Sequence, residues 1–209
     1  LTNLAWSWAN STVALFGYWA AALTIDKPWM GRRRMQLLGF LVIGVIFSVC
    51  GLFYGPLTQD AHVQLFQVLY FLSTFFGQLG PNATTFLLPS ELFPTEVRTV
   101  AHGFSAAAGK LGALFAASVF AMIGPRDTFF ICGGCGVAGL VVTYLFVPDV
   151  TTLDLTELDL MWAAKRRGGA YRGPAAEDRY FSPFERWPRA GGRGDDAASP
   201  ARTDPGPGG

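Results

Sequence analysis

Charged residues are almost absent from five long stretches of this sequence, and their absence argues against a soluble domain. No Asp, Glu, Lys or Arg occurs in residues 4–25, 35–59, 61–90 and 128–148, and residues 99–125 contain one such residue, Lys110. Each stretch is long enough to cross the hydrocarbon core of a bilayer, which takes about 20 apolar residues in a helix. The sequence therefore predicts an all-α membrane protein with five transmembrane helices.

Cysteine and histidine are scarce too, since the chain has three Cys and two His. Cys132 and Cys135 have the spacing of a redox or metal-binding pair. The glycines around them favour a closely packed helix face instead. The sequence contains no His, Cys and Glu cluster that suits a metal and no Ser–His–Asp arrangement. We therefore predict neither an enzyme nor a cofactor, and no nucleic-acid partner.

The basic residues outside these stretches predict an orientation. All of them except Arg126 gather in residues 27–34, at Arg98 and after residue 164. Five crossings would bring all three groups to one side of the membrane, and positively charged loops favour the cytoplasmic side. The C-terminus is then cytoplasmic and the two termini lie on opposite sides, which predicts further helices upstream of this segment.

The chemistry of the chain changes near residue 150. Residues 1–149 are predicted to form the helical bundle, and residues 150–209 a cytoplasmic tail. The tail begins with a short amphipathic helix near residues 153–165, where Leu and Met alternate with acidic residues. From Gly168 onward Gly, Pro, Arg and Asp dominate, a composition that cannot bury a core and favours disorder.

Lys110 is the leading candidate for function. It stands near the middle of its apolar stretch, and an ionisable group at that depth costs roughly 2.5–3.5 kcal/mol on insertion scales. The alternative is a lysine that snorkels to the membrane surface. Because roughly 16–20 Å of helix extends on either side of Lys110 at 1.5 Å per residue, its side chain is too short for that. We therefore predict that Lys110 binds an anion or exchanges a proton with one.

A second candidate region follows Gly80-Pro81, which interrupts the third stretch. Proline inside a helix removes a backbone donor and produces a kink. Asn82, directly after the break, offers a donor and an acceptor to a ligand. Alternatively, the polar side chains there satisfy only the backbone groups that the kink frees. Further residues on a possible substrate path are Gln78, Thr85 and Tyr18.

Charged residues at the predicted cytoplasmic ends of the helices form a third set. We expect ion pairs among them to hold helix ends in one conformation, and so to gate the path rather than contact substrate. The set consists of Asp26, Arg32, Arg33, Glu91 and Arg98.

These patterns resemble the major facilitator superfamily. Asp26 through Arg33 is similar to the loop between its eighth and ninth helices, although longer than usual, and Glu91 through Arg98 to the motif after the tenth. The sequences GPNATTF at 80–86 and AHGFSAAAGKLG at 101–112 resemble the phosphate:proton symporters of fungi, plants and algae. The resemblance implies helices 8–12 of a twelve-helix fold. It also implies that Asn82 contacts the phosphate, and that Lys110 either helps to hold it or pairs with a proton-carrying Asp of the missing seventh helix.

The resemblance also implies partners and a setting. Inorganic phosphate and protons would be the transported species, in a multi-pass protein of the lipid bilayer, with the plasma membrane as the expected site. The missing N-terminal half and the seventh helix would complete the path. Two alternatives stay open, namely a sugar or organic-ion carrier of the same superfamily and a phosphate-sensing transceptor.

Overall fold

The chain folds into helices that follow the apolar stretches closely. The computed structural model describes residues 2–59, 61–151 and 154–167, and within those ranges the secondary structure is helical, with no strand. The elements are α1 (Thr2–Thr24), α2 (Gly31–Leu52), α3 (Tyr54–Leu57), α4 (Val63–Gly77), the π-helix η1 (Gln78–Asn82), α5 (Ala83–Leu92), α6 (Arg98–Phe120), α7 (Pro125–Phe146) and α8 (Leu155–Arg166). The predicted all-α fold is confirmed.

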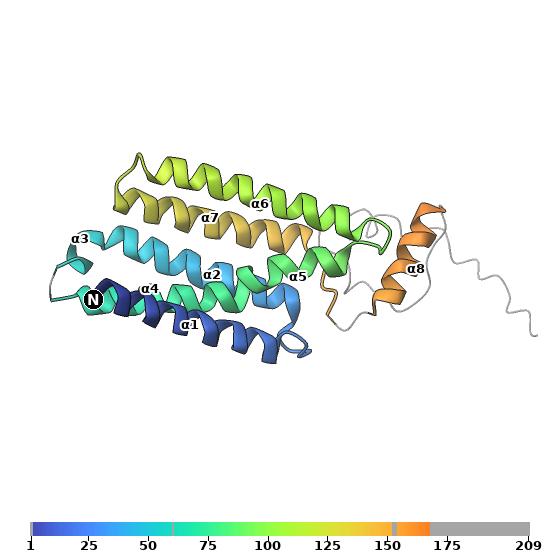
Figure 1. The fold of residues 1–209 in the computed structure, drawn as a ribbon, viewed down its shortest axis with the longest axis horizontal. Coiled ribbons are helices and arrows are strands. Elements are labelled where there is room, and N and C mark those ends of the chain that lie inside the picture. Colours follow the sequence, from blue (N-terminus) through green and yellow to red (C-terminus); the bar gives the residue numbers. More distant parts are fainter. Residues whose placement is uncertain (1, 60, 152–153, 168–209) are drawn as a thin grey trace, which may run out of the picture.

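The long helices run back and forth along one axis (Figure 1). The turns at residues 25–30 and 93–97 lie at the end of the bundle nearest α8, and α3 and the turn between α6 and α7 lie at the opposite end. Helix α8 lies across the direction of the long helices. We call the end nearest α8 the charged end, because the predicted gating residues gather there. The part of the predicted tail from Gly168 onward lies outside the described residues.

Within the described residues, three helices are long and apolar enough to span a bilayer, namely α2, α6 and α7. Helix α1 has 23 residues but carries several polar side chains. The third predicted crossing is continuous from Val63 to Leu92 but is divided into α4, η1 and α5. The crossings by α1 and by α4–η1–α5 stay predictions.

Helix α2 is the centre of the packed part of the molecule. It packs against α7 along its length and against α4 and η1 on another side. Met35 of α2 is fully buried in a core cluster with Ala21 and Leu79. Gly39 and Gly80 bring the backbones of α2 and η1 into contact, since a β-carbon on Gly80 would lie 2.7 Å from the Gly39 Cα. Close approach of small residues thus fixes η1, and with it the predicted ligand residues, against the core.

Helix α6 is packed far less. Its principal described contact is with α5, and none of its residues is buried. Figure 1 shows α5 and α6 close together at the charged end and diverging towards the opposite end. The helix that carries Lys110 therefore has its side chains largely uncovered.

Candidate functional site

The break predicted at Gly80-Pro81 is a π-helix. Pro81 has no N–H and its ring clashes with the preceding turn, so one wider turn accommodates it within a continuous helix. Two hydroxyls bond carbonyls in this turn: Thr84 Oγ1 donates to Gly80 O at 3.0 Å and Thr85 Oγ1 to Pro81 O at 2.6 Å. Thr84 is fully buried while Thr85 is exposed. Both hydroxyls thus satisfy backbone carbonyls that the wider turn frees, Thr84 in the core and Thr85 on the exposed side of the helix.

Asn82 and Gln78 form a pair of amides on the exposed side of this turn. Asn82 Nδ2 donates to Gln78 Oε1 at 2.9 Å, and Asn82 is exposed. A side-chain amide has two N–H donors and a carbonyl acceptor, so each partner keeps further hydrogen-bonding capacity. The mutual bond orients both groups, which the sequence pattern alone did not indicate.

The amide pair belongs to a longer row of polar side chains along α4, η1 and α5. The row recurs every three or four residues, which is the spacing of one helix face. We call it the polar stripe; it consists of Gln67, Tyr70, Thr74, Gln78, Asn82 and Thr85. Helix α1 joins it where Thr74 Oγ1 donates to Asn10 Oδ1 at 2.8 Å. The sequence analysis missed Gln67 and Thr74, although their helical spacing would have revealed them. It also missed Asn10, whose bond to Thr74 joins residues 64 positions apart and follows from no local pattern.

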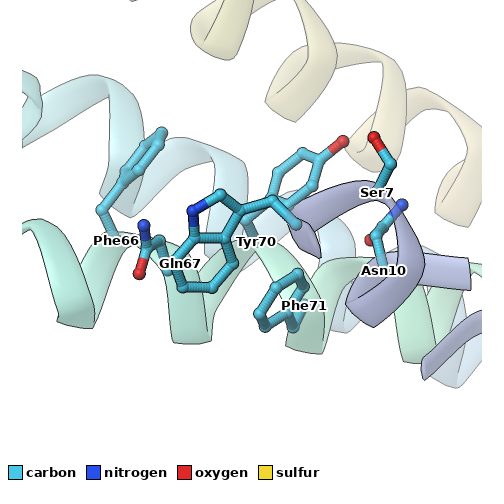
Figure 2. Close-up of a pocket in the computed structure, with 7 residues that line it drawn as sticks. Ser7, Asn10, Phe66, Gln67, Tyr70 and Phe71 are labelled. Atoms are coloured by element: carbon cyan, nitrogen blue, oxygen red, sulfur yellow. The ribbon is translucent and has the colours of Figure 1, made fainter. Parts of the chain in front are cut away.

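A pocket of about 220 Å³ opens at the end of the polar stripe formed by Gln67 and Tyr70. It lies between α1 and α4, with Trp6, Ser7 and Asn10 on one side and Gln67 and Tyr70 on the other. Figure 2 shows the Tyr70 ring extending from α4 towards Ser7, with Asn10 beside Ser7. The pocket thus combines apolar walls with hydroxyl and amide groups, and it leads to the polar stripe at Tyr70.

Tyr18 lies on α1 at the level of η1. Its neighbour Gly17 touches α4 and η1, because a β-carbon there would lie 2.7 Å from Phe75 O and 2.8 Å from Gln78 Cβ. The Tyr18 side chain is 46% exposed. The structure therefore brings Tyr18 to the height of Gln78 on the neighbouring helix.

Lys110 is exposed near the middle of α6. No hydrogen bond or ion pair joins Lys110 to Asn82 or to any other residue in the part of the chain that the structure describes. The contact between the Phe86 and His102 rings, at 6.4 Å, sets the register of α5 and α6. From there Lys110 is eight residues, or about 12 Å, along α6, and Asn82 four residues, or about 6 Å, back along α5. The two candidates thus differ in height by about one helical turn, on diverging helices.

At the charged end, Arg32 joins three elements. Its Nε and Nη2 donate to the Glu91 carboxylate at 2.8 and 2.9 Å, and Nη1 lies 2.9 Å from Asp26 Oδ1. The Arg32 backbone N–H also bonds Thr151 Oγ1 at 3.1 Å. Gly31, with a φ of 66°, turns the chain into α2 in the left-handed region that favours glycine. A bidentate pair at a partly buried position ties α2 firmly to α5.

Arg33 and Arg98 have other partners than the sequence pattern suggested. Arg33 Nη2 donates to Tyr144 O at 2.7 Å, at the end of α7. Arg98 Nε donates to Phe93 O at 3.1 Å, and its Nη2 lies 3.9 Å from Asp159 of α8. The five charged residues therefore gather at one end, where Arg32 pairs with both Asp26 and Glu91, and where Arg33 and Arg98 also bond α7 and α8.

Helix α8 docks on the turn after α5, a feature that the sequence analysis missed. Asp159 accepts bonds from the Thr95 backbone N–H, at 2.8 Å, and from the Thr95 hydroxyl. Trp162 Nε1 donates to Leu92 O at 3.2 Å, and Arg166 pairs with Glu96. Hydrogen bonds from the Thr95 hydroxyl and then its N–H lower the pKa of Asp159. Its carboxylate therefore stays ionised and holds α8 at the charged end.

Within the described ranges, no group of three or more His, Cys, Asp and Glu is arranged to hold a metal ion. The candidate site thus consists of neutral polar groups on the polar stripe, the Lys110 cation in the middle of α6 and ion pairs at the charged end.

Comparison with known proteins identifies relatives. Residues 2–162 match the family described as Sugar (and other) transporter. The chain is 41% identical over 184 residues to the probable inorganic phosphate transporter 1-9 of Oryza sativa subsp. japonica, covering 79% of this chain and 31% of that protein. It is 37% identical over 156 residues to the probable inorganic phosphate transporter 1-9 of Arabidopsis thaliana, covering 68% and 29%. With low affinity inorganic phosphate transporter 4 of Medicago truncatula, identity is 47% over 113 residues, covering 52% and 21%.

The chain spans less than a third of the length of these relatives. The family match nevertheless extends over α1 to most of α8 and includes the polar stripe, Lys110 and the charged end. The chain therefore belongs to the sugar (and other) transporter family of multi-pass membrane proteins, within the major facilitator superfamily, and its similarity is to inorganic phosphate transporters.

Proposed function

We propose that this chain is part of a transporter that takes up inorganic phosphate together with protons, by alternating access. Similar proteins carry the name inorganic phosphate transporter. Their function is transport and not covalent chemistry, so we propose no enzymatic reaction and no cofactor. Because the chain corresponds to less than a third of those relatives, the activity is proposed for the whole protein.

The observation that carries the proposal is the polar stripe at the π-helical turn. Asn82 and Gln78 are oriented by their mutual bond, and Asn82 faces the open side of the helix. Amide N–H groups donate to the oxygens of an anion, and unwound helix segments in transporters line substrate sites. Tyr18 lies at the same height and Thr85 one turn further on, so the proposed path runs along this face.

Lys110 supplies the charge in this proposal. A phosphate anion at mid-membrane depth requires a positive partner, since unpaired charges are costly in hydrocarbon. Lys110 lies about one turn in height from Asn82, on a helix without buried residues. In the whole transporter, closure of α6 towards the polar stripe would bring its ammonium group to the phosphate bound at Asn82.

The rest of the transporter would complete the site. We propose that α1, α2, α4–η1–α5, α6 and α7 are helices 8–12 of a twelve-helix fold, with residues 1–149 in the membrane bundle and residues 150–209 as its cytoplasmic tail. The seventh helix and the N-terminal half would cover α6 and supply the carboxylate that carries the proton. The plasma membrane is the proposed location.

Ion pairs at the charged end would gate this path. Arg32, Asp26 and Glu91 connect the ends of α1, α2 and α5. Arg98 connects the end of α6 to α8, and Arg33 connects the end of α2 to α7. Opening of the path towards the cytoplasm would require these ion pairs and hydrogen bonds to break and re-form with other partners. The residues of the polar stripe, and not these charged residues, would contact the substrate.

The test is uptake of radiolabelled phosphate by the full-length protein in proteoliposomes with an imposed pH gradient. We expect uptake driven by an inward proton gradient, abolished by a protonophore, and strongly reduced by Asn82→Ala. Thr58→Ala is the control, since Thr58 directly follows α3, is exposed and is not part of the polar stripe. A rate of uptake that does not change with the pH gradient would contradict proton coupling. An absence of phosphate uptake would contradict the assignment of phosphate as the substrate.

The family description also includes sugars, so a sugar carrier is the second candidate. The same proteoliposomes distinguish the two, because a hexose in excess would compete with phosphate in a sugar carrier. We expect no competition, since Lys110 suits an anion rather than a neutral solute.

A further inference from the structure

We propose that a groove between α2 and α7 binds one anionic phospholipid from the leaflet at the charged end. Two connected hollows of about 410 and 200 Å³ lie along these helices and share Leu41 and Leu140. We call them together the α2–α7 groove. Its wall includes Leu37, Leu41 and Val45 of α2 and Val137, Val141 and Tyr144 of α7. This groove is distinct from the polar stripe, and the proposal is independent of phosphate transport.

The groove has the chemistry and the length of one acyl chain. Most of its wall is branched aliphatic, and Leu41 and Val141 are about half exposed. From Leu37 to Ser48 the groove follows eleven residues of α2, or about 16 Å. That length is about half of the ~30 Å hydrocarbon core of a bilayer. A chain lying in the groove would therefore reach from the headgroup level to the middle of the membrane.

Two arginines stand at the mouth of the groove. Arg33 lies over the Tyr144 ring, with Cζ 5.4 Å from the ring centre, and Tyr144 itself lines the groove. Arg34 precedes Leu37, Leu38 and Leu41 by three, four and seven residues, so it lies on the same face of α2. It is exposed, and its Nη1 is bonded to Trp29 O at 3.1 Å. The helix face that forms the groove thus ends in guanidinium groups.

The charge and the depth of this mouth select an anionic headgroup. The nearby carboxylates of Asp26 and Glu91 bond Arg32, the residue before Arg33 and Arg34, so their charges are paired with a third arginine. Trp29 is 61% exposed and Tyr144 56% exposed, and exposed aromatic residues of this kind lie at the headgroup level of membranes. Arginine presents a planar fork of donors that matches a phosphate. A lipid with a net negative charge gains from both arginines, whereas a zwitterionic lipid gains less.

The experiment uses the full-length transporter in nanodiscs of phosphatidylcholine with a minor fraction of phosphatidylglycerol. Native mass spectrometry then counts the lipids that stay bound to the protein after it is released from the nanodisc. We expect one phosphatidylglycerol to be retained in preference to phosphatidylcholine. Each basic residue near an anionic surface contributes about 1 kcal/mol, or about fivefold in affinity. Arg33→Gln with Arg34→Gln should therefore lower the preference by about 25-fold, and Arg34→Gln alone by about fivefold.

Matched variants distinguish binding of the lipid in the α2–α7 groove from general attraction of anionic lipids to the basic surface. Lys27→Gln removes the same charge at the same end from an exposed turn outside the groove, and should leave the preference unchanged. Arg33→Lys with Arg34→Lys keeps the charge and should keep most of the preference even if Arg33 also supports the fold. Val141→Trp fills the groove and should abolish retention. Val142→Trp is its control, since Val142 is 54% exposed on the same helix but does not line the groove.

Three outcomes would overturn the proposal. An equal loss in Lys27→Gln would mean diffuse attraction to the surface. Retention by Val141→Trp at the wild-type level would mean that the lipid lies elsewhere. Absence of any retained anionic lipid on the wild-type protein would mean that another segment of the transporter, rather than a lipid, covers the groove.

Discussion

Helices α2 and α6 have nearly the same length and are both apolar enough to span a membrane, yet they are packed very differently. In the most apolar part of α2, 39% of the residues are buried, and in that of α6 none is. Helix α2 contacts α4, η1 and α7, whereas α6 has its principal described contact with α5. The fold of this chain is thus organised around α2.

The difference separates structural residues from candidate functional ones. Met35 and Gly39 of α2 support η1, so that the amide pair at Asn82 has a rigid base. Lys110 stands on the helix that this chain leaves uncovered. A β-carbon added to Gly109 or Gly112 of α6 would meet no atom within 4 Å, so the described part of the chain gives this face no packing partner. The predictions below test that contrast.

Replacing Lys110 should have the largest effect. In the full-length protein, Lys110→Ala should lower phosphate uptake by about 10- to 100-fold, because one hydrogen bond between charged groups contributes about 1.5–3 kcal/mol. The measurement is the initial rate of radiolabelled phosphate uptake, corrected for the amount of protein in the membrane. Lys110→Arg should keep part of the activity, since it keeps the charge.

Lys27→Ala is the control for this prediction, because Lys27 is an exposed cation in the turn between α1 and α2. An unchanged uptake rate in Lys110→Ala would contradict the functional role of α6, since this helix would then contribute no charge to the substrate path.

Glycines on the two helices should respond in opposite ways. Gly80→Ala would push a methyl group against Gly39 Cα and Met35 O, at 2.7 and 2.9 Å, so it should destabilise the protein by about 1–3 kcal/mol. Gly109→Ala meets no atom within 4 Å in this chain. The melting temperature of the purified full-length protein measures both.

A loss of stability in Gly109→Ala equal to that in Gly80→Ala would reveal a tight partner for α6 elsewhere in the transporter. A stable Gly80→Ala variant would show that the close approach of α2 and η1 is not required.

The positions of the helices were largely predictable from the sequence, because uncharged runs end where the chain must turn. The break at Pro81 was predictable too, since proline cannot continue the backbone bonding of an α-helix. Its π-helical form and the bond between Asn82 and Gln78 were not, because they depend on how α2 packs against the turn. The docking of Asp159 on Thr95 joins residues 64 positions apart, and no local pattern specifies such a contact.

Removing the carboxylate that holds α2 at the charged end should have a moderate effect. Glu91→Gln would keep the shape but turn an amide N–H towards a guanidinium group, in a pair whose side chains are 14% and 20% exposed. We expect a loss of about 1–3 kcal/mol, seen as a lower melting temperature. Glu96→Gln removes an exposed ion pair with Arg166 and should change stability by at most about 1 kcal/mol. Equal effects would mean that the pair with Arg32 is no more than a surface contact.

The smallest effect is expected at α8, which is held by polar contacts rather than by the packing that holds α2. Asp159→Asn should weaken the bonds to Thr95, and hydrogen exchange of residues 155–166 in the full-length protein should become faster while exchange in α2 stays slow. Because the pKa of Asp159 is lowered, its contribution is complete above the usual aspartate pKa of about 3.9 and is lost as the pH falls through the lowered value. After correction for intrinsic rates, wild-type exchange in α8 should therefore be equal at pH 5 and pH 7. Faster exchange at pH 5 would assign the docking to a group other than Asp159.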